Sequence, residues 1–169
     1  DYYTREDFAV KNTVPTAEGA LEIAMREYAG TINGSNCLVA GYGRIGKVLA
    51  WMLRGIGAKV TVSARRTSDL AWVELFGYQA VKTDDICDRD QYDLIFNTIP
   101  ALVFNRRMLS KAREGTILID LASAPGGVDY EAAEKLGIRV IKALSLPGRV
   151  APKAAGEIIK NTIYNIMEE

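Results

Sequence analysis

Residues 41–46, GYGRIG, carry three glycines at the spacing of a dinucleotide-binding turn. In such a turn the first glycine permits a tight bend, the second lets the backbone approach a pyrophosphate, and the third lets a helix pack closely on a strand. The N-terminus of the following helix then presents free N–H groups to the phosphates. Glycines at this spacing could also shape a tight corner without a ligand. The predicted cofactor contacts in this turn are Gly41, Gly43, Arg44, Ile45 and Gly46.

The segment VSARRTSD, residues 62–69, lies where a dinucleotide-binding protein usually has an acidic residue that binds the adenosine ribose, about twenty residues beyond the glycine turn. Ser63 stands near this position instead, and Arg65, Arg66 and Thr67 follow shortly after it. A carboxylate would repel a 2′-phosphate, whereas guanidinium groups pair with it bidentately. The segment therefore predicts NADP rather than NAD, with one arginine able to stack on the adenine ring. A solvated basic turn is the alternative.

Three further loops follow predicted strands, where ligands of an open parallel sheet bind. They are NTIP (97–100), LASAPGG (121–127) and LSLPGRVAPK (144–153). Asn97 and Thr98 can hydrogen-bond the nicotinamide ribose. Each loop could also be an ordinary turn of an α/β fold. The predicted cofactor contacts in the first two loops are Asn97, Thr98, Pro100, Leu121, Ala122 and Ser123.

Arg149 and Lys153 are four residues apart near the start of the last predicted helix, so they can share a helix face. Two cations beside a helix N-terminus would suit an anionic substrate, although both could be ordinary surface charges. The catalytic residue is not assigned by the sequence. Lys153 and Asp120, which lies at the end of a predicted strand, are the candidates for acid–base work.

These residues need a scaffold in which short apolar strands alternate with amphipathic helices. Strands are predicted at 36–41, 59–64, 78–81, 92–100, 115–123 and 138–144. Helices are predicted near 16–28, with Thr16 as N-cap, and at 44–56, 68–76, 105–113, 129–136 and 151–167. Strands that are apolar throughout, each followed by a helix, indicate a parallel sheet covered on both faces. The predicted fold is a Rossmann-type α/β doubly wound sheet of about six strands with an extra N-terminal helix.

Composition narrows the class of function. Lys plus Arg and Asp plus Glu both number 21 among 169 residues, so no net charge favours nucleic acid or an anionic membrane. No apolar run approaches the ~18–20 residues that span a bilayer. The chain has no histidine, which excludes His-based proton transfer from this chain and most zinc sites, and we predict no metal site. Cys37 and Cys87 have no metal-ligand spacing and fit a reducing cytoplasm.

Four stretches together resemble the family of dipicolinate synthase A subunits. They are NTVPTAEGALEIAM (12–25), GYGRIGKVLAWMLRGIGAKVTVSARR (41–66), DLIFNTIPALVFN (93–105) and LIDLASAPGGVDYEAAEKLGIRVIKALSLPGRVAPKAAGEII (118–159). The resemblance covers about residues 12–165. Its more specific part is DLASAPGGVD with LPGRVAPKAAG, since the glycine turn alone is shared by many dehydrogenases.

The resemblance implies NADP-dependent oxidation of dihydrodipicolinate to dipicolinate, in the mother-cell cytoplasm of a sporulating bacterium, together with a flavoprotein-like B subunit. It implies a dicarboxylate substrate for Arg149 and Lys153, and leaves a homo-oligomer open. It also implies a smaller N-terminal domain, which we expect to be largely missing before Asp1. Residues 1–34 would then form the interdomain connection and helix, and 35–169 the NAD(P)-binding domain. We expect this chain to be inactive alone, because a cleft between two domains loses a wall when one is absent.

Two alternatives remain open. A shikimate- or 2-hydroxyacid-type NADP dehydrogenase domain shares the architecture, but 2-hydroxyacid enzymes of this kind need an arginine and a histidine beside the carbonyl. Ala122-Ser123-Ala124 stands near where that arginine would be expected. A non-catalytic NAD(P)-sensing domain would need the glycine turn but not the LPGRVAPK loop.

Overall fold

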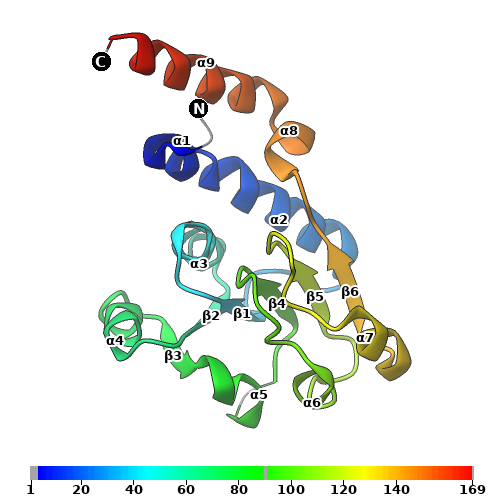
Figure 1. The fold of residues 1–169 in the computed structure, drawn as a ribbon. Coiled ribbons are helices and arrows are strands. Elements are labelled where there is room, and N and C mark those ends of the chain that lie inside the picture. Colours follow the sequence, from blue (N-terminus) through cyan, green and yellow to red (C-terminus); the bar gives the residue numbers. More distant parts are fainter. Residues whose placement is uncertain (1–3, 90, 169) are drawn as a thin grey trace.

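The computed structural model describes residues 4–89 and 91–168 (Figure 1). The strands are β1 (Asn36–Ala40), β2 (Lys59–Ala64), β3 (Gln79–Lys82), β4 (Leu94–Asn97), β5 (Ile117–Asp120) and β6 (Arg139–Lys142). The helices are α1 (Glu6–Lys11), α2 (Thr13–Glu27), α3 (Arg44–Ile56), α4 (Thr67–Leu75), η2 (Thr83–Asp85), α5 (Ile86–Arg89), α6 (Arg106–Leu109), α7 (Tyr130–Leu136), α8 (Leu146–Val150) and α9 (Pro152–Glu168). The six predicted strands are therefore confirmed, with shorter bounds for most of them.

The described strands form one parallel sheet in the order β3-β2-β1-β4-β5-β6. This is the Rossmann order, and the predicted doubly wound fold is confirmed. The chain moves outward in one direction from β1 and returns to β4 before moving outward in the other, so the strand order reverses between β1 and β4. Ala40 and Asn97 are register partners at the carboxyl ends of these two strands. A ligand site is expected at this switch point.

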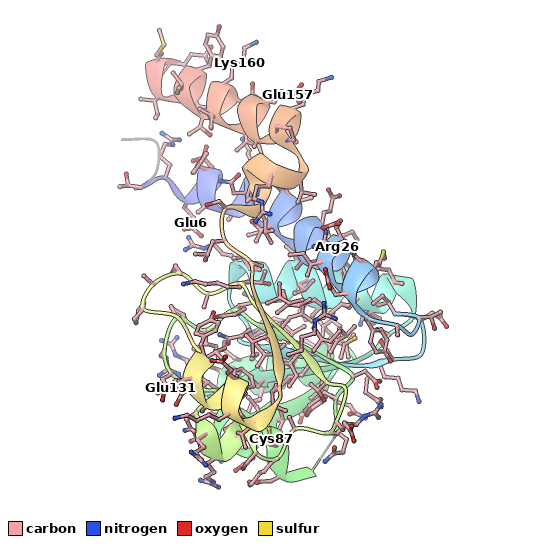
Figure 2. All side chains as sticks on the ribbon, turned by 90° about the vertical axis from the view of Figure 1, so that its right-hand side faces the viewer. Glu6, Arg26, Cys87, Glu131, Glu157 and Lys160 are labelled. Carbon is pink, nitrogen blue, oxygen red and sulfur yellow. The ribbon has the colours of Figure 1, made fainter. Side chains whose placement is uncertain are left out.

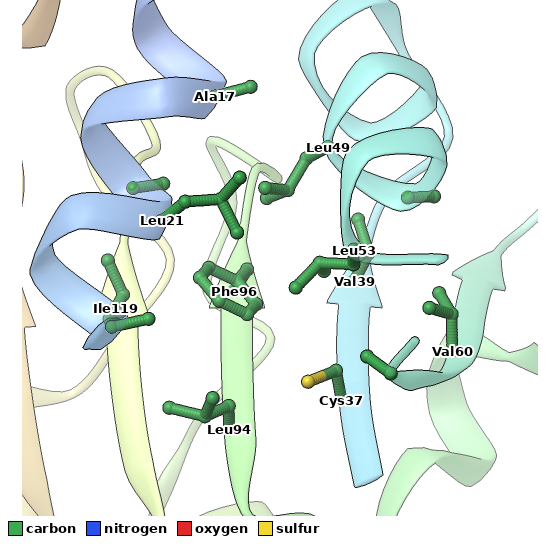
Figure 3. Packing of buried hydrophobic residues seen from close by; sticks show 14 of the residues in the cluster. Ala17, Leu21, Cys37, Val39, Leu49, Leu53, Val60, Leu94, Phe96 and Ile119 are labelled. Atoms are coloured by element: carbon green, nitrogen blue, oxygen red, sulfur yellow. The ribbon is translucent and has the colours of Figure 1, made fainter. Parts of the chain in front are cut away.

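Two apolar clusters cover the two faces of the sheet. On one face, α2, α3 and α4 bury residues against the strands, and on the other α5, α6 and α7 do so. Figure 3 shows Leu21 of α2 and Leu49 of α3 reaching toward Phe96 of β4. Full burial of a side chain of this size contributes about 1.5–3 kcal/mol to folding. Because α2 contributes buried side chains to this cluster, this helix packs on the sheet.

The N-terminal segment is more helical than predicted. α2 begins at Thr13, three residues before the predicted N-cap Thr16. Pro15 is compatible with this start, because a proline in the first turn of a helix displaces no intrahelical hydrogen bond. α1 was not predicted, since a helix of 6 residues carries little periodicity; its Phe8 is buried. The helix predicted at 105–113 shortens to α6.

The C-terminal segment corrects one prediction about Arg149 and Lys153. Arg149 lies in α8 and Lys153 in α9, and Ala151 between them has φ −136° and ψ 63°. Because Pro152 disfavours helical geometry at the residue before it, the helix breaks there. The two cations therefore do not share the face of one helix. Figure 2 shows Glu157 and Lys160 of α9 far from Glu131 of α7, and α9 extends away from the sheet.

Among the described residues, each helix is too short or too polar to cross a lipid bilayer.

The glycine turn gives a direct test of the fold. A Cβ at residue 46 would overlap the carbonyl oxygen of Gly41, whereas one at Gly55, in the same helix, meets no atom within 4 Å. We expect Gly46→Ala to lower the free energy of unfolding by about 1–3 kcal/mol or more, because the helix must move off the strand. Gly55→Ala should raise it by up to about 1 kcal/mol. Chemical denaturation measures both, and equal stability of the two variants would contradict this account of the turn.

Candidate nucleotide-binding site

The glycine turn joins β1 to α3 at the switch point. Gly41 has φ +101°, a conformation that favours glycine, and a Cβ there would lie 2.5 Å from Oγ1 of Thr98. A Cβ at Gly43 would meet nothing within 4 Å, so the space above this residue is open. Gly43 is the N-cap of α3 and provides no side-chain cap, which leaves the first N–H groups of the helix for a ligand. The turn therefore has the geometry of a phosphate site.

Two adjoining cavities lie beside this turn, each of about 320 Å³. They share Arg65, Thr83 and Ile99. The first is lined by Gly41, Tyr42, Gly43, Ala64, Arg65, Arg66, Asp69, Thr83, Thr98, Ile99 and Pro100. The second continues over residues that follow β3 and β4. Together they form an extended depression along the carboxyl ends of β1, β2, β3 and β4, which suits a dinucleotide better than a compact ligand.

The charges of the first cavity are mixed. Arg65 and Arg66 are exposed at the end of β2, and Arg66 is the N-cap of α4. Asp69, in the first turn of α4, lines the same cavity. Sequence reasoning missed this carboxylate, although it closes the segment VSARRTSD. Its position one turn into α4 brings it back toward the arginines.

Thr83 is a site residue that sequence reasoning also missed. It directly follows β3, its side chain is buried, and it lines both cavities. Its Oγ1 has no hydrogen-bond partner in the described part of the chain. A buried hydroxyl without a partner costs free energy, so its position at the cavity wall fits a ligand that supplies the bond. The signal available in sequence was its place just after a predicted strand.

Several predicted cofactor residues lie outside the linings of these cavities. Ser63 is fully buried in β2, with Oγ unpartnered among the described residues. Arg44 donates to Glu6 of α1 at 2.5 Å, and Ile45 packs against the apolar core. Leu121 and Ala122 are buried after β5, and Ser123 is exposed. Of the predicted set, the first cavity brings together Gly41, Gly43, Arg65, Arg66, Thr98 and Pro100.

A polar network connects the ends of β4 and β5. Asn97 is fully buried; its Oδ1 accepts from Ile99 N at 3.1 Å, and its Nδ2 donates to Asp120 Oδ1 at 2.9 Å. Tyr130, at the start of α7, donates its hydroxyl to Asp120 Oδ2 at 2.5 Å. Burial and the Asp120 carboxylate raise the pKa of Tyr130 far above its ordinary value. The network runs from cavity-lining Ile99 through two buried side chains to a half-exposed phenol.

Arg149 lies in a different place from the glycine turn. It lines a cavity of about 430 Å³ between α2, β6 and α8, with Glu22, Arg26 and Lys142 among its neighbours. Lys142 also contacts Tyr130 of the polar network described above, because its Nζ lies 5.7 Å from the centre of the Tyr130 ring. Lys153 is exposed on α9. The structure therefore places Arg149 beside β6 and Lys153 on α9, which extends away from the sheet.

The chain is similar to known proteins along nearly its whole length. It is 39% identical over 168 residues to the A subunit of dipicolinate synthase from Bacillus subtilis, covering 99% of this chain and 57% of that protein. The crystal structure of the A subunit from Bacillus halodurans matches with a TM-score of 0.95 and 40% identity, over 99% of this chain and 58% of that chain. The crystal structure of the Bacillus subtilis protein matches with a TM-score of 0.95 and 38% identity, over 98% and 56%. The resemblance noted from sequence is confirmed.

A more distant match shows only that the fold is shared. A transhydrogenase from Sinorhizobium meliloti is 19% identical with a TM-score of 0.81, over 96% of this chain and 55% of that chain. The chain spans a little over half the length of the relatives it matches. Residues 10–135 match the family described as D-isomer specific 2-hydroxyacid dehydrogenase, NAD binding domain. The chain therefore belongs to this family of nicotinamide-nucleotide-binding dehydrogenase domains.

Proposed function

We propose that this chain is the cofactor-binding part of a dipicolinate synthase A subunit, which oxidises dihydrodipicolinate to dipicolinate with NADP in the cytoplasm of a sporulating mother cell. The similarity to two Bacillus A subunits over nearly the whole chain supports the reaction. The observation that supports NADP as cofactor is the cavity at the switch point, which is lined by both the glycine turn and two exposed guanidinium groups. A flavoprotein-like B subunit would be its partner, as the resemblance implies.

The residues that would hold NADP are distributed along the two cavities. The N-terminus of α3 would bind the pyrophosphate, and Arg65 with Arg66 would bind the 2′-phosphate. The N-terminus of α4, which has no side-chain cap, adds free N–H groups at the same place. Thr83 would offer its hydroxyl to the adenosine. When bound, the nicotinamide supplies the hydride acceptor for the oxidation.

The oxidation removes a hydride and a proton from the dihydropyridine ring, and the proton needs an acceptor. In the proposed scheme Tyr130 takes this proton at its hydroxyl oxygen while its own proton passes along the hydrogen bond to Asp120 Oδ2. The formation of an aromatic ring assists this loss, so a weak base suffices. Asn97 holds the other oxygen of Asp120 and keeps the carboxylate aligned. A dicarboxylate substrate would meet Arg149 and Lys153 from the β6 side.

NAD is the second candidate cofactor, and one observation favours it. Asp69 lines the cavity beside Arg65, and a carboxylate there can accept hydrogen bonds from the 2′- and 3′-hydroxyls of an unphosphorylated ribose. The two exposed arginines outnumber this one carboxylate, which is why we place NADP first.

The first prediction of this proposal concerns the arginines. Arg65→Gln with Arg66→Gln should weaken NADP binding about ten- to a hundredfold, because two charge-assisted contacts to the 2′-phosphate are lost. NAD binding should change little. Isothermal titration of both nucleotides measures the difference, and Arg106→Gln, an exposed arginine outside both cavities, is the matched control.

The Asp69→Asn variant distinguishes NADP from NAD as the native cofactor. If NADP is native, the variant should bind NADP more tightly, since a repelling charge is removed. Loss of NAD binding together with a preference of the unmutated chain for NAD would instead assign NAD, and the arginine prediction would be wrong.

The second prediction concerns Thr83. Thr83→Val should weaken NADP binding up to about tenfold, because a hydrogen bond to the nucleotide is lost. It should leave thermal stability unchanged or higher, since the free hydroxyl has no partner in the described chain. Thr116→Val is the matched control: this equally buried hydroxyl donates to Tyr92 O at 2.7 Å, so its loss should lower stability and spare binding. A stability loss at Thr83 with unaltered binding would contradict the assignment.

The third prediction concerns the polar network. Asp120→Asn should lower the pKa of Tyr130 toward its ordinary value of 10.0, because the negative charge of Asp120 is removed while burial remains. Ultraviolet titration of tyrosinate, each protein being compared with its Tyr130→Phe counterpart, isolates this phenol. Since the folded pKa exceeds the unfolded one, the stability that Tyr130 contributes is present at neutral pH and is lost as the pH rises through the raised pKa. An unchanged titration would exclude Asp120 as its partner.

A further inference from the structure

A second concave surface lies between α3 and α4. This aromatic groove has a volume of about 580 Å³ and is lined by Tyr42, Lys47, Trp51, Arg54, Trp72, Phe76 and Tyr78. Lys47, Trp51 and Arg54 are spaced so that they share one face of α3. The rings of Trp72 and Phe76 stack across the end of α4, with centroids 5.8 Å apart and planes at 21°. Nothing in the proposed oxidation uses these side chains.

Several large apolar side chains in and beside the groove are exposed to solvent. Trp51 is 62% exposed, Trp72 54% and Phe76 51%, and Leu75 beside them is 73% exposed. Contiguous exposed patches of large apolar side chains mark interaction sites. Trp, Tyr and Arg are the residues that dominate binding energy at protein interfaces. Leu75 lies outside the lining, so a small ligand filling the groove would leave it in solvent, whereas a protein surface would cover it.

The groove is also positively charged. The Nζ of Lys47 lies 5.3 Å from the ring centre of Tyr42, and the guanidinium of Arg54 lies 4.5 Å from that of Tyr78. Within residues 4–89 and 91–168, neither cation forms a salt bridge with a carboxylate. Arg54 is further fixed by donation to the carbonyl of Phe76. The rings hold both cations in place, which prepares them for carboxylates on an incoming surface.

We infer that the aromatic groove docks the second subunit of the complex, through a segment of that subunit in which carboxylates flank an aromatic or branched aliphatic side chain. The inference rests on the proposed function, which supplies the partner. The apolar side chain fills the groove between Trp51 and Trp72, and the carboxylates meet Lys47 and Arg54. Tyr42 lines both the groove and the nucleotide cavity, so the docked subunit sits directly beside the bound cofactor.

The test measures binding of the full-length protein to a purified B subunit. Trp51→Ala with Trp72→Ala should weaken the complex about thirtyfold or more, as truncation of central anchors does. Lys47→Gln should slow association and reduce its dependence on salt. Met25→Ala, which truncates a 56% exposed side chain on α2 outside the groove, is the control and should leave affinity unchanged. Because both tryptophans are more than half exposed, the variants should keep the thermal stability and NADP affinity of the unmutated protein.

The outcomes separate the inference from the proposed function. If the double tryptophan variant binds the B subunit as well as the unmutated protein does, the groove is not the docking surface, and the proposed oxidation stands. If the unmutated protein shows no binding, both the partner and the groove assignment are overturned. If the variant instead abolishes self-association without affecting the B subunit, the occupant is a second copy of the chain and the inference is wrong.

Discussion

The close approach of α3 to the end of β1 is the constraint on which the site depends. A side chain at Gly46 has no room beside the Gly41 carbonyl, and the positive φ of Gly41 turns the chain sharply out of the sheet. Gly41 N donates to Ser63 O at 3.1 Å, which ties the turn to β2. Because the helix starts immediately above the strand, its free N–H groups face the crevice between β1 and β4. A looser turn would carry the phosphate site away from the arginines of β2.

The chemistry of the site comes from strand ends that are distant in sequence. β2 is followed by Arg65 and Arg66, β3 by Thr83, and β4 by Thr98 and Ile99. Parallel strands bring these positions to one edge whatever their separation along the chain. The same geometry explains why the cavity is electrostatically mixed. α4 begins at the end of β2, so its first-turn carboxylate, Asp69, lines the same cavity as Arg65 and Arg66, which precede it.

The sequence was sufficient for the sheet and insufficient for parts of the site. Strands such as β1 and β4 are apolar throughout, as strands buried on both faces must be, and this pattern is legible without a structure. Short elements such as α1 and α5 have no such pattern; among their described side chains, Phe8 and Ile86 are the buried ones. Arg65 and Arg66 could be placed at the candidate cavity from sequence because exposed charges after a strand depend little on packing, and their contact with the cofactor stays a prediction. Thr83 was missed because it is notable for a buried hydroxyl without a hydrogen-bond partner in the described chain. The periodicity of a sequence does not show which hydroxyl groups lack partners.

Asn97 forms hydrogen bonds within the protein that its residue type and strand-end position did not predict, and its contact with the nicotinamide ribose stays a prediction. A polar side chain at the end of β4 was expected to contact the nicotinamide ribose, yet its amide donates to Asp120 and to Ile99 O, and its carbonyl accepts from Ile99 N. A Cβ at Gly127 would overlap Asn97 Nδ2, so the loop after β5 closes over this amide. A buried carboxylate needs such donors, because its desolvation is otherwise too costly. Asn97 therefore binds one oxygen of the Asp120 carboxylate while Tyr130 donates to the other, and its hydrogen bonds with Ile99 and Asp120 tie the loop after β4 to the end of β5.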